Sequence, residues 1–324
     1  MDVVPIQAYF LPALLSAIAL AWGAGKFVDG AVSLSFDLGL SPLVVGIIVM
    51  GFGTSLPEFV VSVMSSATGS SALSLGNAYG SNIINIGLVL GLSAVIKPVI
   101  VQNHVVHREL PLLLLATAAT AVLVIDMELS RTDGLILSFS FVLALLFLVI
   151  VSSRNTAAAG KTGFMRKVQD NSGTLQKSIK QLILGLVMIV ACSAVLVWSA
   201  KGIAVQLGVS ELIVGVVVLA LGTSLPELAV VVVAARRGEH QLALGNVIGS
   251  NLFNTLAVVG VASAITPYDI DPDLVIRDLP VMFAFTAFLV VIGYRWGRHT
   301  GVINKVEGIL LMLAFLGYMV CLIY

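Results

Sequence analysis

The stretch GFGTSLPE, residues 51–58, decides the fold of this chain, because it places a proline and a glutamate inside a long apolar run. A charged side chain at the centre of a bilayer costs about 2.5 kcal/mol or more, and a proline removes a backbone hydrogen bond that lipid cannot replace. Six of these residues, GTSLPE, recur at 222–227. A costly pattern that occurs twice predicts that both copies serve the function.

The composition is that of an integral membrane protein. Of the 324 residues, 59% are hydrophobic and 10% are charged, whereas soluble domains carry about 25% charged residues. Membrane lipid is therefore the expected surrounding partner. The formal net charge is zero, which gives no indication of nucleic-acid binding.

Apolar stretches of about 20 residues, the length that crosses a bilayer, occur ten times. The fold class that they predict is an all-α integral membrane protein with ten transmembrane helices. We expect these helices near 7–28, 42–67, 71–96, 109–126, 133–152, 179–199, 211–235, 241–265, 279–295 and 302–323.

Basic residues predict the orientation. Residues 153–178 form the only long polar linker, and placing it in the cytoplasm puts both termini outside. Of the 17 Lys and Arg residues, all but Arg131, Lys201 and Arg277 then lie on the cytoplasmic side. This positive-inside bias predicts a multi-pass plasma-membrane protein in this orientation.

The chain contains an internal duplication at an offset of 169 residues. Residues 46–92 align without a gap with residues 215–261, and 21 of the 47 aligned positions are identical. We therefore expect a first five-helix half at 1–152 and a second at 179–324. Because five is odd, the two copies enter the membrane from opposite sides. Such inverted repeats are typical of transporters whose site lies between the repeats.

Each GTSLPE copy combines a helix break with a carboxylate. Pro57 and Pro226 remove helical hydrogen bonds, which can turn the preceding threonine carbonyls away from their helical partners. Each threonine stands four residues before a glutamate, so the two share a helix face. Carbonyl and carboxylate oxygens together suit a hard cation. The residues concerned are Thr54, Glu58, Thr223 and Glu227.

The second part of each repeat supplies a helix with one polar face, on which we expect Asn77 and Asn246 to bond neighbouring helices. GNAYGSNIIN and GNVIGSNLFN each place three polar side chains four apart on one helix face. These residues are Asn77, Ser81 and Asn85, and then Asn246, Ser250 and Asn254. Asn82 and Asn251 point off this face, and we expect them to bond neighbouring helices.

The ligand types predict the class of ion. No histidine or cysteine joins the cluster, which argues against zinc or copper and for calcium, sodium or potassium. One Ca²⁺ would neutralise the two glutamates. Monovalent ions could use the same carboxylates with the hydroxyl groups of Ser55, Ser81, Ser224 and Ser250.

At GTSLPE and at GSNIIN or GSNLFN, the sequence resembles the calcium/cation antiporter superfamily, and it is most similar to the prokaryotic sodium/calcium exchanger branch. The resemblance implies exchange of sodium for calcium by alternating access, without an organic cofactor. An exchange of about three Na⁺ for one Ca²⁺ would move one net charge, worth ~2.3 kcal/mol per 100 mV. The first and sixth helices would slide past the other eight.

The resemblance also implies roles for the motif residues. Glu58, Glu227 and the carbonyls of Thr54 and Thr223 would bind calcium. The same residues would bind sodium with the hydroxyls of Ser55, Ser81, Ser224 and Ser250. Asn85 and Asn254 would line the site. Some members of the family that it resembles, notably potassium-dependent and some archaeal exchangers, carry aspartate at the position of Asn254, and its absence here argues against potassium coupling.

Other functions stay open from the sequence. The nearest is a proton/calcium antiporter of the same fold, because a buried glutamate can titrate near neutral pH, although that branch usually has GNxxE in place of GTSLPE. A cation channel would conduct without a counter-ion. An enzyme would need a nucleophile and base, or metal-ligating histidines, within the spans, and all four histidines fall in or beside loops. The oligomeric state is left open, and a monomer is compatible with the sequence.

Overall fold

The computed structural model describes residues 6–68, 71–158, 175–207, 219–294 and 300–323, and most of them are helical. Eight helices in this part of the chain are long and apolar enough to cross a membrane, and a ninth crossing consists of two helices that meet at a 47° bend. The chain is thus an all-α membrane protein. The seventh predicted span, 211–235, begins outside the described residues, so the count of ten stays a prediction.

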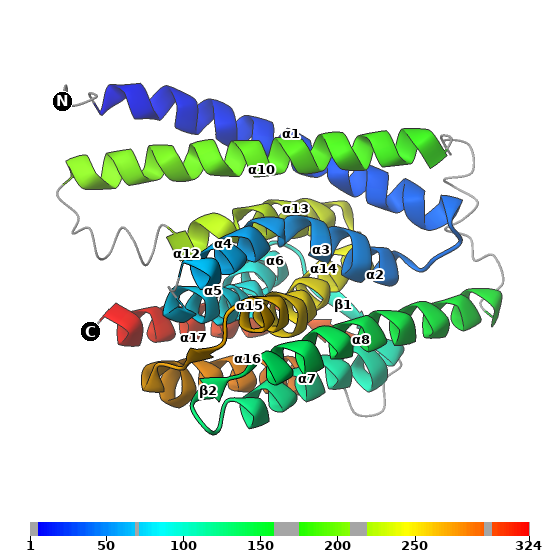
Figure 1. The fold of residues 1–324 in the computed structure, drawn as a ribbon. Helices are drawn as coiled ribbons and strands as arrows, with labels where there is room; N and C mark the ends of the chain where they lie inside the picture. Colours follow the sequence, from blue (N-terminus) through cyan, green and yellow to red (C-terminus); the bar gives the residue numbers. More distant parts are fainter. Residues whose placement is uncertain (1–5, 69–70, 159–174, 208–218, 295–299, 324) are drawn as a thin grey trace.

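Two long helices, α1 (Gln7–Asp37) and α10 (Leu175–Gln206), lie side by side along one face of the bundle (Figure 1). Their backbones approach closely because glycine has no side chain. A Cβ atom at Gly185 would meet the Cα of Phe27 at 2.7 Å. Both helices extend beyond the predicted spans 7–28 and 179–199, because helical hydrogen bonds continue through polar turns that the apolar run does not include.

The second crossing is broken at the first GTSLPE motif. Ser55 leaves helical geometry with φ −87° and ψ 10°, and Pro57 stands in the first turn of the next helix, where its missing N–H has no helical partner to lose. The segments along this crossing are α2 (Pro42–Val45), the π-helical η1 (Gly46–Gly51), α3 (Phe52–Thr54) and α4 (Leu56–Ala67).

The second GTSLPE motif has the same local geometry. Helix α12 (Leu219–Thr223) ends before Ser224, whose φ is −87° and ψ is 4°, and α13 (Leu225–Arg237) begins with Pro226 in its first turn. Identical motifs therefore give identical breaks in the two halves of the chain. In each case the glutamate of the motif stands in the first turn of the helix that follows.

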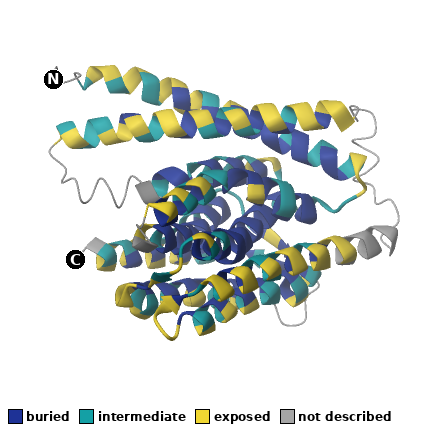
Figure 2. Cartoon of the chain, viewed as in Figure 1, coloured by how far each residue is buried: buried dark blue, intermediate teal, exposed yellow. Residues whose placement is uncertain are grey.

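Two helices that follow the broken crossings form the centre of the bundle. The first half contributes α5 (Ser71–Ile84), η2 (Asn85–Leu90) and α6 (Gly91–Ile96). The second half contributes α14 (His240–Leu252), η5 (Phe253–Val258) and α15 (Val259–Ile265). Every residue of α14 from Leu242 onward is buried, and Figure 2 shows this helix among the most buried parts of the molecule. Both central helices therefore pass through the interior, and their polar side chains face protein.

Longer helices cover these central elements and expose apolar side chains (Figure 2). The fifth predicted span, 133–152, is part of a longer helix, and residues 159–174 of the predicted linker lie outside the described residues. The covering segments are η3 (Val105–Glu109), α7 (Leu110–Leu123), α8 (Arg131–Ala158), η6 (Leu274–Asp278), α16 (Leu279–Gly293) and α17 (Lys305–Ile323).

Short strands join the two halves, a feature that the sequence analysis did not predict. Strand β1 (Val99–Gln102) pairs antiparallel with β4 (Thr300–Ile303), and β2 (Glu128–Leu129) pairs antiparallel with β3 (Tyr268–Asp269). In each pair, one strand belongs to the first half and the other to the second. The pairing is therefore reciprocal between the halves.

Candidate cation site

The two motif glutamates lie in the interior, where α4 and α13 begin. Glu58 and Glu227 have no exposed surface, and their carboxylates are close enough to interact electrostatically. In the described part of the chain, neither forms an ion pair with a basic side chain. Two negative groups without a basic partner are unfavourable in an apolar interior, unless protons or cations neutralise them.

The Glu227 carboxylate is surrounded by residues of both halves. Ser55 Oγ donates a hydrogen bond of 2.8 Å to Glu227 Oε1. Thr54 of the first half and Ser250 of the second also lie against this carboxylate. The break at Ser55 is what brings a first-half hydroxyl group to a second-half glutamate.

The Glu58 carboxylate has a related environment. Ser81 Oγ lies 3.5 Å from Glu58 Oε1, and Thr223 of the second half contacts the same carboxylate. The structure thus brings together both glutamates, both threonines and three of the four serines proposed from the sequence. The fourth serine, Ser224, is buried, and its hydroxyl group has no hydrogen-bond partner among the described residues.

Several buried polar atoms of the two motifs also lack hydrogen-bond partners in the part of the chain that the structure describes. An unpaired buried acceptor costs about 1–3 kcal/mol, so a cluster of them requires an explanation. Most of these atoms are oxygens, which a cation could satisfy together. They are Oε2 of Glu58, Oε2 of Glu227, Oδ1 of Asn85, Oδ1 of Asn246, Oδ1 and Nδ2 of Asn254, and Oγ of Ser224.

The donor set fits a hard cation. Among the described residues, no group of three or more His, Cys, Asp or Glu side chains could hold a metal. The oxygens available at the centre are instead two carboxylates with hydroxyl, amide and backbone oxygens. Such a set suits calcium or sodium better than zinc or copper.

Asn77 and Asn246 occupy equivalent positions but bond differently. Asn77 Nδ2 donates to the carbonyl oxygen of Glu58 at 3.1 Å and to Ser62 Oγ at 2.9 Å, within its own half. Asn246 Nδ2 donates across the halves to Thr54 Oγ1 at 3.0 Å. Nδ2 of each asparagine therefore supports a motif residue, and the sequence alone does not distinguish their partners.

Glycines allow α14 to pack tightly against η1. A Cβ atom at Gly249 would overlap the carbonyl oxygen of Ile47, and one at Gly51 would meet the Ser250 nitrogen at 2.7 Å. Gly76 and Gly80, which are the first-half equivalents of Gly245 and Gly249, are only half-buried, and no described atom lies within 4 Å of a Cβ built there. The seam between α14 and η1 is thus closed, whereas the described residues leave space at the equivalent glycines of α5.

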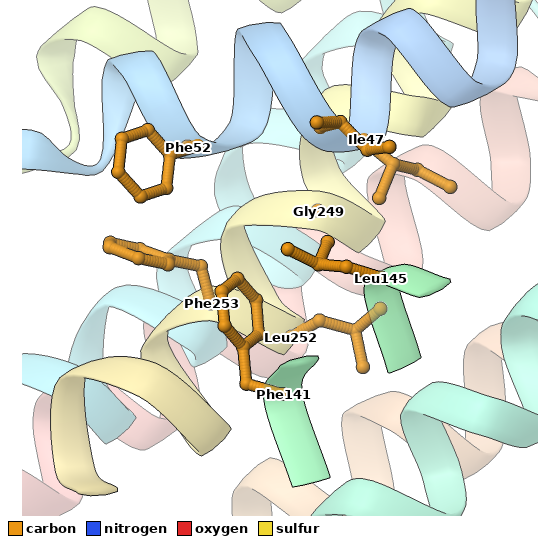
Figure 3. Close-up of a pocket in the computed structure, with 8 residues that line it drawn as sticks. Ile47, Phe52, Phe141, Leu145, Gly249, Leu252 and Phe253 are labelled. Atoms are coloured by element: carbon orange, nitrogen blue, oxygen red, sulfur yellow. The ribbon is translucent and has the colours of Figure 1, made fainter. Parts of the chain in front are cut away.

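An apolar pocket of about 280 Å³ lies beside the closed seam, between η1, α3, α8 and α14 (Figure 3). Phe253 of η5 also lines the pocket, and its ring centroid lies 4.7 Å from that of Phe52 and 5.5 Å from that of Phe141. All the lining side chains are apolar or glycine, so this pocket offers no side-chain ligand to a cation. The sequence gave no signal for it.

The fold and this site define a multi-pass membrane protein with two buried carboxylates, one from each half, at its centre. The family of sodium/calcium exchanger proteins matches residues 9–150 and 177–324, and the chain belongs to this family. The resemblance predicted from the two repeats is thereby confirmed. The family consists of cation antiporters rather than enzymes.

Relatives and a solved structure agree with this membership. The chain is 39% identical over 306 residues to the putative antiporter CaxA of Alkalimonas amylolytica, covering 94% of this chain and 95% of CaxA. It is 28% identical to the sodium/calcium exchanger MaX1 of Methanosarcina acetivorans, covering 98% and 99% of the two chains. A structure of the sodium-calcium exchanger NCX_Mj superimposes with a TM-score of 0.83 at 31% identity, covering 96% of this chain and 97% of the other.

Proposed function

We propose that this protein is a secondary antiporter that exchanges sodium for calcium across the membrane by alternating access. The observation that carries the proposal is the pair of buried carboxylates, Glu58 and Glu227, without a basic partner in the described part of the chain. One Ca²⁺ neutralises both. Sodium ions that use the same carboxylates exclude calcium, and this competition gives exchange rather than cotransport.

The unpaired oxygens support a specific set of ligands. Calcium binds Glu58, Glu227 and the carbonyl oxygens of Thr54 and Thr223, and water completes the roughly six to eight oxygens that it prefers. Sodium binds the same residues together with serine hydroxyl groups, and two asparagines line the space between. The serines are Ser55, Ser81, Ser224 and Ser250, and the asparagines are Asn85 and Asn254.

The relatives support these two ions as transported substrates. MaX1 is named a sodium/calcium exchanger, and NCX_Mj was solved after soaking with Na⁺ and either Ca²⁺ or Sr²⁺. With two fixed carboxylates, a cycle of about three Na⁺ against one Ca²⁺ moves one net charge and responds to the membrane potential by ~2.3 kcal/mol per 100 mV.

Alternating access requires that one part of the protein move against another. In the proposed architecture, ten helices form two inverted halves, 1–152 and 179–324, and α1 and α10 slide past the remaining eight. The close packing of α1 with α10 supports their movement as a pair. The unequal packing at Gly249 and Gly80 supports access from one side at a time.

The proposed topology places both termini outside a plasma membrane and the 153–178 linker in the cytoplasm. The first turn of α1 and the last turn of α17 lie on one side of the bundle, and the end of α8 and the start of α10 lie on the other (Figure 1). This arrangement supports a linker on the side opposite the termini. The basic residues support assigning that side to the cytoplasm.

Uptake of radioactive calcium into proteoliposomes tests the proposal. Vesicles loaded with sodium should accumulate calcium when external sodium is absent, with the pH equal on both sides and a protonophore present. Vesicles loaded with potassium instead serve as the control and should not accumulate it.

Each rival function gives a different result in this assay. A proton/calcium antiporter would need a pH gradient and would ignore the sodium gradient. A channel would carry calcium without sodium on the opposite side. Absence of sodium-driven uptake with intact, calcium-binding protein would overturn the proposal.

A further inference from the structure

Asn82 and Asn251 are equivalent residues that meet where α5 and α14 cross. Their side chains are 1% exposed, so their polar atoms must find partners within the protein. Asn82 Nδ2 lies 3.5 Å from the carbonyl oxygen of Asn251, and Asn251 Nδ2 lies 3.4 Å from the carbonyl oxygen of Asn82. The backbone contacts are thus reciprocal.

The other contacts of these two side chains are not reciprocal. Asn82 Nδ2 also donates to Thr255 Oγ1 at 2.8 Å. The residue equivalent to Thr255 in the first half is Ile86, which has no hydroxyl group. Asn251 Nδ2 therefore has no hydroxyl partner at that position. Asn251 Oδ1 accepts a hydrogen bond of 3.2 Å from Asn85 Nδ2.

These contacts decide which end of each amide faces which way. A backbone carbonyl only accepts hydrogen bonds, so the carbonyl of Asn82 must face the NH₂ group of Asn251. The oxygen of Asn251 then faces Asn85 and needs a donor there. Asn85 consequently turns its own NH₂ group toward Asn251 and its oxygen away from it. That oxygen, Asn85 Oδ1, is buried and has no donor among the described residues.

Asn85 follows Ser81 by one helical turn, and Ser81 contacts the Glu58 carboxylate. We infer that Asn251 is a positioning residue, which holds Asn85 so that its carbonyl oxygen rather than its NH₂ group faces the transported cation. This inference rests on the proposed function, because it assigns a role within the same site. Asn251 itself does not touch the ion.

The equivalent residue of the second half is held differently. Neither Nδ2 nor Oδ1 of Asn254 has a hydrogen-bond partner in the described part of the chain, and Oδ1 of Asn82, the atom equivalent to the acceptor on Asn251, has none there either. The two halves thus offer the ion one oriented amide oxygen and one amide that is not oriented by a neighbour.

Calcium binding to the purified full-length protein, measured by equilibrium dialysis with radioactive calcium, tests the inference. Asn251→Leu keeps the branched shape of the side chain but removes the acceptor, and the dissociation constant should rise about three- to tenfold, the effect of one hydrogen bond. Asn251→Asp keeps an oxygen opposite Asn85, and affinity should not fall. Asn82→Leu is the matched control, because it removes an equally buried amide without removing the partner of Asn85, and affinity should change less than twofold.

A double-mutant cycle separates positioning from packing. Aspartate presents an oxygen whichever way it turns, so in the Asn85→Asp background Asn251→Leu should leave affinity unchanged or improve it. An equal loss in both backgrounds would overturn the inference, as would a loss from Asn82→Leu as large as that from Asn251→Leu. Binding is measured without a sodium gradient. Wild-type protein that binds calcium but does not exchange it would therefore refute the proposed function and leave this test intact.

Discussion

Ser55 Oγ donates a hydrogen bond of 2.8 Å to Glu227 Oε1, although 172 residues separate the two in the sequence. Its equivalent, Ser224, is equally buried but has no hydrogen-bond partner among the described residues. The two serines therefore have the same predicted role as sodium ligands but different roles in the protein without ions.

Replacing each of these serines with alanine should separate the two roles. Without ions, Ser55→Ala should lower the free energy of unfolding by about 1–3 kcal/mol, because the buried Glu227 carboxyl group loses its donor. Ser224→Ala removes no hydrogen bond and should change this free energy by less than about 0.5 kcal/mol. Both should raise the sodium concentration for half-maximal exchange. Normal sodium dependence of Ser224→Ala would contradict its assignment as a ligand.

Glu58→Gln and Glu227→Gln should each abolish sodium-driven calcium uptake, because one remaining carboxylate cannot neutralise Ca²⁺. Folding should be retained, since glutamine has nearly the same shape and removes the repulsion between the two acids. Thermal unfolding with and without calcium measures both the stability of each variant and its binding of calcium. Wild-type protein at a calcium concentration 100 times the dissociation constant should gain about 2.7 kcal/mol. The variants should gain nothing, and exchange that survives in either would refute the site.

Gly249→Ala and Gly80→Ala form a matched pair at equivalent positions. Gly249→Ala should destabilise the protein by about 1–3 kcal/mol, because its methyl group overlaps the η1 backbone. Gly80→Ala meets open space among the described residues and should stabilise α5 by up to about 1 kcal/mol. If α5 closes against α12 in the other half of the cycle, Gly80→Ala should nevertheless slow transport. Equal thermal stability of the two variants would contradict the seam described at α14.

Arg237 connects α13 to α1. Its Nη1 donates hydrogen bonds to Asp29 Oδ1 at 2.5 Å and to the carbonyl oxygen of Gly25 at 3.2 Å. The ion pair is about half exposed, so Arg237→Gln should change the free energy of unfolding by less than about 1 kcal/mol. Because this link must break if α1 slides past α13, the variant should exchange calcium faster. Arg236→Gln, one residue away, is the control and should leave the rate unchanged. A rate lowered by Arg237→Gln alone would argue against sliding at this interface.

Local chemistry made part of this molecule predictable. The proline of each GTSLPE motif predicted a discontinuity, and the backbone leaves helical geometry at Ser55 and Ser224. The internal repeat predicted that Glu58 and Glu227 belong to one site, and both side chains are buried in the interior. These features follow from residues close together in the chain, or from two identical motifs.

Other features depend on contacts that no short stretch of sequence specifies. Asn85 donates its hydrogen bond to the side chain of Asn251, which stands 166 positions away in the chain. Gly249 is buried against η1, whereas Gly80 is half-buried and no described atom lies within 4 Å of a Cβ built there. Equivalent residues differ here because the two halves adopt different packings, and a sequence repeat cannot report such a difference.

The pairing of strands from opposite halves affects how the protein folds during synthesis. Val99 of the first half pairs with Ile303, and Leu129 of the first half pairs with Tyr268. Until the second half is synthesised, β1 and β2 present unpaired edges, and such edges readily join other chains. Each half is therefore incomplete alone, and a protein cut within 159–174 should be recovered only when both fragments are made in the same cell.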